Sequence, residues 1–139
     1  MILYILDTDT CSYVLRQRPI QVLEKMEEMG AAGHSITISS ITYAELLLGA
    51  ERSKAKKKHL GLIHSFVECL DEILPWNDSA AESFSKLQAA LYKKGTPIGP
   101  NDTMIAGHVL SLNGTIVTNN TKHFKKVSSI KIENWTLKC

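Results

Sequence analysis

The sequence predicts an α/β fold in three layers, with helices on both faces of a central, mainly parallel sheet of four to five strands. The chain opens with five apolar residues, Ile2–Leu6, as a strand buried on both faces would. Later apolar runs alternate with segments of helical periodicity, the pattern of right-handed crossovers in a parallel sheet. With 139 residues and 44% hydrophobic content, we expect a single domain spanning residues 1–139.

Short runs rich in apolar or β-branched residues mark the other predicted strands. Ser35–Ser39 has the composition of a strand, and Glu72–Trp76 is a short one that Pro75 ends. The remaining candidates are Thr115–Thr118 and Ile130–Ile132.

Capping residues mark the predicted helices. Pro19 opens a helix that Gly30 ends, and Ser40 is placed as the N-cap of a helix reaching about Ser53. Asp78 is placed as the N-cap of a long amphipathic helix. The other helical segments are Thr10–Arg16, His59–Leu70 and Asn101–Leu112, and the long helix ends at Lys94.

Charge and composition exclude several classes of protein. A net charge of only +2 argues against a protein whose whole surface binds nucleic acid, but it is compatible with local basic patches. The three cysteines, Cys11, Cys69 and Cys139, have no metal-type spacing and suggest a reducing compartment. Because no apolar run approaches the roughly 18 residues of a membrane span, we expect a cytoplasmic protein without a membrane partner.

Three acidic residues stand where solvated acids are not expected. Asp7 ends the first strand, and Glu45 and Asp102 each share a helical stripe with apolar residues. Taken singly, each acid has a structural explanation. Asp7 could cap the turn that follows it, Glu45 could pair with a lysine, and Asp102 could interact with the positive end of its helix dipole. The strand ends and helix starts of an open parallel sheet, however, meet in one crevice, which would also receive Ser40 and Thr118.

Carboxylates gathered in such a crevice favour a divalent cation. They repel one another and stay ionised at neutral pH when a cation neutralises them. Hard oxygen ligands without cysteine indicate Mg²⁺ or Mn²⁺ rather than zinc. Such a site suits metal-assisted hydrolysis of phosphodiester bonds.

Several segments, which together span nearly the whole chain, resemble one known family. They are LDT at Leu6–Thr8, SSITYAELLLGAE at Ser39–Glu51, GTPIGPNDTMIAGHVL at Gly95–Leu110, VTNNTKHF at Val117–Phe124 and IENW at Ile132–Trp135. With these segments the chain resembles the PIN-domain ribonucleases, and among them the VapC toxins of bacterial VapBC toxin–antitoxin modules.

The resemblance implies a PIN-like fold and an Mg²⁺- or Mn²⁺-dependent endoribonuclease with catalytic Asp7, Glu45 and Asp102. Asp7 and Asp102 would bind the metal directly, and Glu45 through water. The family often has a fourth acid where this chain has Asn120, a neutral ligand or a residue that binds metal-bound water. Asp9 stands where relatives commonly have Asn, and we expect it to cap the following turn rather than to add charge to the site. The supporting residues would be Thr8, Asp9, Ser40 and Thr118.

The resemblance also implies the partners. Similar toxins cut initiator tRNA in the anticodon loop, which is the preferred substrate, and inhibit translation until a VapB antitoxin covers the acidic pocket. The toxins usually form homodimers and larger toxin–antitoxin assemblies, which bind operator DNA only through the antitoxin.

Basic residues near the two later motifs are candidates for RNA contacts, because phosphates are otherwise repelled by the acids. Lys93, Lys94 and Lys122 are preferred, and the run Lys54–Lys58 is more simply a solvated surface. The other candidates are Arg16, Arg18, Lys125 and Lys126. His108 is either a packed core residue or a hydrogen-bonding neighbour of the site, with packing favoured. His123 is assigned no chemistry.

Two alternatives remain open. The segment Asp7–Cys11, DTDTC, nearly fits the nucleophile loop of haloacid-dehalogenase-type phosphatases, in which Asp7 would be phosphorylated. The chain could also be an inert PIN-fold module that binds RNA or protein. Such a module would not need Asp7, Glu45 and Asp102 together.

Overall fold

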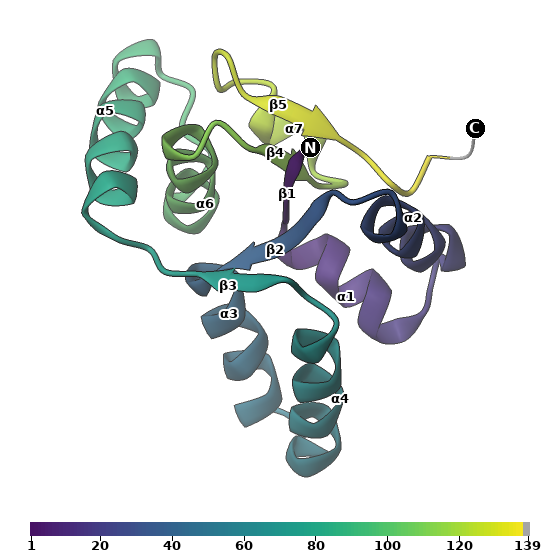
Figure 1. Cartoon of the computed structure of the whole chain (residues 1–139). Helices are drawn as coiled ribbons and strands as arrows, with labels where there is room; N and C mark the ends of the chain where they lie inside the picture. The colour runs from purple at the N-terminus through teal and green to yellow at the C-terminus, as the bar shows by residue number, and fades with distance from the viewer. Residues whose placement is uncertain (138–139) are drawn as a thin grey trace.

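The computed structural model describes residues 1–137 and consists of a five-stranded sheet and seven helices (Figure 1). The strands are β1 (Leu3–Leu6), β2 (Ser35–Ser39), β3 (Glu72–Leu74), β4 (Thr115–Val117) and β5 (Lys131–Glu133). Their order is β3-β2-β1-β4-β5, and every neighbouring pair is parallel. The predicted α/β class with a parallel sheet is therefore confirmed, and β1 lies at its centre.

Helices form a layer on each side of the sheet (Figure 1). One layer contains α1 (Thr8–Arg16), α2 (Ile20–Ala31), α3 (Ser40–Glu51) and α4 (Lys56–Glu68), and the other contains α5 (Asp78–Lys94), α6 (Pro100–Ser111) and the short α7 (Thr121–Phe124). Successive side chains of a strand point to opposite faces. Accordingly, Tyr4 and Leu6 pack into one hydrophobic core and Ile5 into the other.

Two predicted N-caps are wrong by one position. Ser39, not Ser40, caps α3, since Ser39 is extended and its side chain accepts a hydrogen bond from the Ile41 N–H. The hydroxyl of Ser40 instead accepts a hydrogen bond from the backbone N–H of Trp76. Asn77 likewise caps α5 in place of Asp78, accepting from Ala80.

Several other boundaries also differ from the predicted ones. Gly30 lies inside α2, which continues to Ala31, and α1 begins at Thr8 because Asp7 is its N-cap. The basic run contributes the first turn of α4, and β5 starts one residue later than predicted. The short helix α7 has no counterpart among the predicted helices.

Two further expectations concern the cysteines and the membrane. Cys11 is buried and Cys69 exposed, and both are free thiols, while Cys139 lies outside the described residues. Among residues 1–137, no helix has the length and apolar character needed to cross a membrane.

Candidate active site

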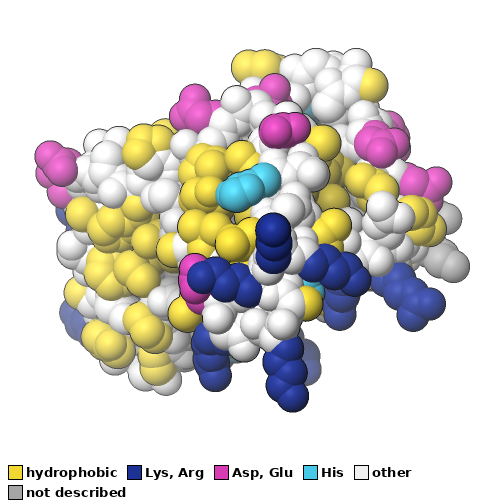
Figure 2. Space-filling model, turned by 90° about the horizontal axis from the view of Figure 1, so that it is seen from below, with side chains coloured by type: hydrophobic (Ala, Val, Ile, Leu, Met, Phe, Trp, Pro, Cys, Tyr) yellow, Lys and Arg dark blue, Asp and Glu magenta, His cyan; other side chains and the backbone are white. Residues whose placement is uncertain are grey.

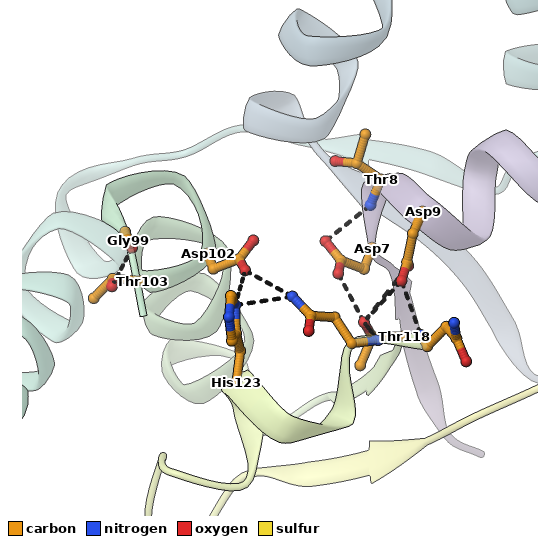
Figure 3. A network of polar contacts seen from close by, with 10 residues as sticks. Asp7, Thr8, Asp9, Gly99, Asp102, Thr103, Thr118 and His123 are labelled. Carbon is orange, nitrogen blue, oxygen red and sulfur yellow. Dashed lines mark hydrogen bonds and ion pairs between the residues drawn. The ribbon is translucent and has the colours of Figure 1, made fainter. Parts of the chain in front are cut away.

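The candidate site forms where β1 and β4 end (Figure 3). These strands are parallel neighbours in which Leu6 pairs with Val117, so the residues that follow them, Asp7 and Thr118, emerge at the same edge. The backbone N–H of Asp7 donates to the Val117 carbonyl at 2.9 Å, which extends the pairing by one step. The sheet thereby fixes the position of the Asp7 carboxylate.

Asp7 is a buried carboxylate, with only 4% of its surface exposed. Its Oδ1 accepts a hydrogen bond from the Thr8 N–H at 2.8 Å, and its Oδ2 accepts one from Thr118 Oγ1 at 2.8 Å. Burial raises the pKa of Asp7 to about 7, and the nearby charge of Asp9 adds to this effect, although the two hydrogen bonds oppose it. An ionised Asp7 is therefore costly unless a cation is near.

Asp9 does not cap the following turn, so that prediction is wrong. It lies in the first turn of α1, and its Oδ2 accepts a hydrogen bond from the Asn119 N–H at 3.0 Å. Burial raises its pKa, and hydrogen bonds from Asn119 and Thr10 oppose the rise. Asp9 thus connects α1 to the turn after β4 and adds negative charge beside Asp7.

Glu45 is joined to this group through Thr8. The Thr8 hydroxyl donates to Glu45 Oε1 at 2.9 Å, while the Thr8 backbone N–H donates to Asp7. A single residue therefore contacts two of the three predicted acids. Ser40 does not join them, because its hydroxyl is bonded to Trp76.

Asp102 lies in the first turn of α6, where the start of the helix is specified locally. Gly99 adopts a φ of 95°, a left-handed conformation that favours glycine, and Pro100 follows at the first helical position. Thr103 Oγ1 donates to the Gly99 carbonyl at 2.6 Å. The charge of Asp102 contributes to the raised pKa of Asp7, which places the two carboxylates in one electrostatic site.

A contact that sequence reasoning missed lies on the other side of Asp102. His123 Nδ1 is 2.9 Å from Asp102 Oδ2, and Asn120 Nδ2 is 3.3 Å from the same oxygen. Both partners come from the turn after β4 and from α7, the helix that was not predicted. The signal available in the sequence was the segment VTNNTKHF, in which His123 follows Asn120 by three positions.

The remaining predicted residues lie outside this group. His108 is buried, contacts Ser39 Oγ through Nδ1 at 2.9 Å, and has a pKa lowered by burial, as expected of a packed neutral histidine. In the described part of the chain no ion pair joins the exposed residues Lys93, Lys94 and Lys122 to the acids. Their role in RNA binding stays a prediction.

The donor atoms of the site fit a divalent cation. Over residues 1–137, an ion pair joins Glu51 to Lys56 and Asp102 contacts His123, and neither Asp7, Asp9 nor Glu45 has a Lys or Arg partner. Oxygen donors predominate, as Mg²⁺ and Mn²⁺ require. As they stand, no three His, Cys, Asp or Glu side chains of these residues are gathered closely enough to enclose an ion.

A largely apolar groove adjoins the acids between α1, α3 and α4. Tyr13, Leu46, Leu62 and Ile63 contribute apolar surface to it, and Thr8, Asp9 and Glu45 also line it. The groove and the acidic site therefore share residues.

Comparisons with known proteins agree on one family. The PIN domain family model matches residues 4–130. The chain is 38% identical to the tRNA(fMet)-specific endonuclease VapC of Salmonella typhimurium, over 97% of this chain and 99% of the relative. It is 36% identical to the Ribonuclease VapC2 of Rickettsia felis, over 96% of this chain and 98% of the relative.

Solved structures show the same likeness. VapBC2 from Rickettsia felis bound to a promoter DNA fragment matches with a TM-score of 0.90 and 35% identity, over 96% of this chain and 99% of the matched chain. DNA-bound VapBC from Salmonella typhimurium matches with a TM-score of 0.89 and 37% identity, over 97% and 99%. Because these relatives are nucleases, the phosphatase alternative for Asp7–Cys11 is set aside. The chain belongs to the PIN-domain family and, within it, to the VapC ribonucleases.

Proposed function

We propose that the chain is the toxin of a VapBC-type toxin–antitoxin pair, a metal-dependent endoribonuclease that cuts tRNA in the cytoplasm and thereby inhibits translation. The observation that carries the proposal is the meeting of Asp7, Glu45 and Asp102 at one edge of the sheet, with Asp7 buried and without a Lys or Arg partner among residues 1–137. An inert binding module would have no use for this costly arrangement.

The proposed substrate is initiator tRNA, cut in the anticodon loop. Support comes from the Salmonella typhimurium relative, which is named a tRNA(fMet)-specific endonuclease and aligns with 97% of this chain. Exposed Lys93, Lys94 and Lys122 would attract the RNA backbone, since the acids alone repel phosphates.

Asp7 and Asp102 would bind the metal directly, with Glu45 acting through water and Asn120 as a neutral fourth ligand. When bound, Mg²⁺ or Mn²⁺ supplies an activated water and stabilises negative charge on the attacked phosphate. Thr8 and Thr118 orient Asp7, because each of its oxygens accepts one hydrogen bond and keeps further lone pairs free. The Thr8 hydroxyl orients Glu45 in the same way.

The proposed partner is a VapB-type antitoxin. Three of the structural neighbours are VapBC structures, one of them bound to a promoter DNA fragment and another bound to DNA. An apolar antitoxin segment in the groove between α1, α3 and α4 would lie against Asp9 and Glu45 and so exclude RNA from the acids. A homodimer, and operator DNA bound through the antitoxin, complete this proposal.

Two substitutions in the site test the nuclease. Asp7→Asn and Asp102→Ala are each expected to lower cleavage of initiator tRNA by at least about a hundredfold and to abolish growth arrest. Circular dichroism and antitoxin binding should stay unchanged, and Glu24→Gln on α2 is the matched control outside the site. Cleavage that survives both substitutions, or that survives EDTA, would contradict the proposal.

A further inference from the structure

Three side-chain atoms converge beside Asp7 (Figure 3). His123 Nδ1 lies 2.9 Å from Asp102 Oδ2, and Asn120 Nδ2 lies 2.8 Å from His123 Nδ1 and 3.3 Å from Asp102 Oδ2. Each atom is therefore within contact distance of the other two. The residues come from α6, from the turn after β4 and from α7.

With Asp102 as a carboxylate, hydrogen bonding satisfies at most two of the three contacts. If Nδ1 carries a proton, it donates to Asp102 but faces the Asn120 amide hydrogens. If Nδ1 carries a lone pair, it accepts from Asn120 but faces the carboxylate. Rotating the Asn120 amide by half a turn exchanges its nitrogen and oxygen. The amide oxygen then faces the Asp102 carboxylate oxygen, and two acceptors cannot form a hydrogen bond.

A divalent ion would remove this conflict. Ligand atoms at neighbouring corners of an octahedron with bonds of about 2.1 Å lie about 3.0 Å apart. The three measured separations, 2.8, 2.9 and 3.3 Å, are close to that length. With the Asn120 amide oxygen turned inward and Nδ1 unprotonated, the three atoms form one triangular face of such an octahedron.

The side chains of His123 and Asp102 are 41% and 25% exposed, so water and a phosphate oxygen can reach this face, in addition to the Asp7 carboxylate that the proposed function assigns to the same ion. The ion would add positive charge near Asp7, which lacks a Lys or Arg partner among the described residues.

We propose that Asp102, Asn120 and His123 bind one divalent transition-metal ion, and that the imidazole makes this nuclease prefer Mn²⁺ to Mg²⁺. The inference rests on the proposed function and specifies its metal. Mg²⁺ takes almost only oxygen ligands and loses water reluctantly, whereas an imidazole nitrogen favours first-row transition metals.

Spectroscopy of Mn²⁺ bound to the purified chain tests the ligand directly. Electron spin-echo measurements are expected to show ¹⁴N coupling from a coordinated imidazole, and Mn²⁺ should bind at least about tenfold more tightly than Mg²⁺. His123→Glu, which substitutes an oxygen donor, should abolish the coupling and reduce the preference for Mn²⁺. His64→Gln on α4 is the matched control and should change neither result.

The outcomes separate this inference from the proposed function. Bound Mn²⁺ without ¹⁴N coupling, or an unchanged ratio of the two affinities in His123→Glu, would overturn the role of His123 even if cleavage of RNA still required a metal. Binding of neither ion to the purified chain would overturn it as well. RNA cleavage that is indifferent to EDTA would instead overturn the proposed function.

Discussion

Asp7 and its neighbours show how single residues set the properties of the site. Burial and the charge of Asp9 raise the pKa of Asp7, while Thr8 and Thr118 donate one hydrogen bond to each oxygen. The two donors orient the carboxylate, but they do not offset its burial, because the pKa still lies near 7. Among residues 1–137, no Lys or Arg side chain pairs with Asp7 to offset the remaining cost.

This imbalance predicts how the metal-free protein responds to pH. The pKa of Asp7 is about 7 in the folded chain against an ordinary value of 3.8, so the folded state retains the proton to higher pH. Stability in EDTA should then fall as pH rises from about 4 to about 7, at up to about 1.4 kcal/mol per pH unit. Asp9, whose pKa is also raised, acts in the same direction.

Asp7→Asn should weaken this dependence and raise the metal-free stability at pH 8 by a few kcal/mol, because the amide carries no charge. Urea unfolding in EDTA at pH 5 and pH 8 provides the measurement. Equal pH dependence in the wild type and the variant would show that Asp7 is not the titrating group.

Thr8 offers a second prediction, because its backbone contacts one acid and its side chain another. Thr8→Val keeps the N–H bond to Asp7 but removes the hydroxyl bond to Glu45, so kcat should fall by roughly tenfold, the worth of one such hydrogen bond. Thr8→Ser retains the hydroxyl and should restore the rate. An unchanged kcat in Thr8→Val would show that Thr8 does not position Glu45.

The three acids could be predicted from sequence because each breaks an apolar pattern, at a strand end or on a helical stripe. The partners of Asp9 and Asp102 could not. The Asp9–Asn119 bond spans 110 positions and depends on the pairing of β1 with β4. His123 reaches Asp102 only because of α7, four residues that are too short for a periodic signal.

At the scale of elements, the hydrophobic pattern predicted the strands and the longer helices, whereas the N-caps of α3 and α5 were predicted one residue too late. Ser39 and Ser40 are both competent caps, and the choice between them depends on where β2 ends. Ser39 still pairs with Leu74 of β3, so the strand continues through it and the helix begins at the next residue. A tertiary contact thus decided a local boundary.

The packing of α5 against α6 gives a prediction about Gly107. A Cβ at this position would lie 2.7 Å from Phe84 Cα and 2.8 Å from Phe84 N, both backbone atoms that cannot rotate away. Gly107→Ala should therefore separate the two helices and destabilise the fold by about 1–3 kcal/mol.

Gly61 on α4 is the matched control, since a Cβ there meets nothing within 4 Å. Gly61→Ala should leave stability unchanged or raise it by up to about 1 kcal/mol through helix propensity. Thermal unfolding of both variants provides the comparison, and similar effects at the two glycines would contradict the close approach of α5 and α6.

For the whole molecule, the arrangement of layers places the candidate active site and the groove between α1, α3 and α4 side by side. The central position of β1 delivers Asp7 to the middle of the sheet edge, and α1 and α3 lead from this edge into the groove. Figure 2 views the molecule from below, the end at which α3 and α4 lie in Figure 1, and shows hydrophobic side chains beside a group of Lys and Arg side chains. One partner protein can therefore contact the apolar groove and cover the acids at the same time.

Leu62 separates antitoxin binding from catalysis. It lines the groove on α4 and is 43% exposed, so a charge introduced there would be buried by an apolar partner segment without touching the acids. Leu62→Glu should weaken binding of the co-expressed VapB-type antitoxin by about tenfold or more, with RNA cleavage by the free toxin close to that of the wild type.

Leu112→Glu introduces the same change at a residue of similar exposure, 40%, at the end of α6, and should leave antitoxin affinity unchanged. Calorimetric titration gives the two affinities, and growth assays with co-expressed antitoxin should show that only Leu62→Glu escapes neutralisation. Equal affinities for the two variants would place the antitoxin segment outside the groove.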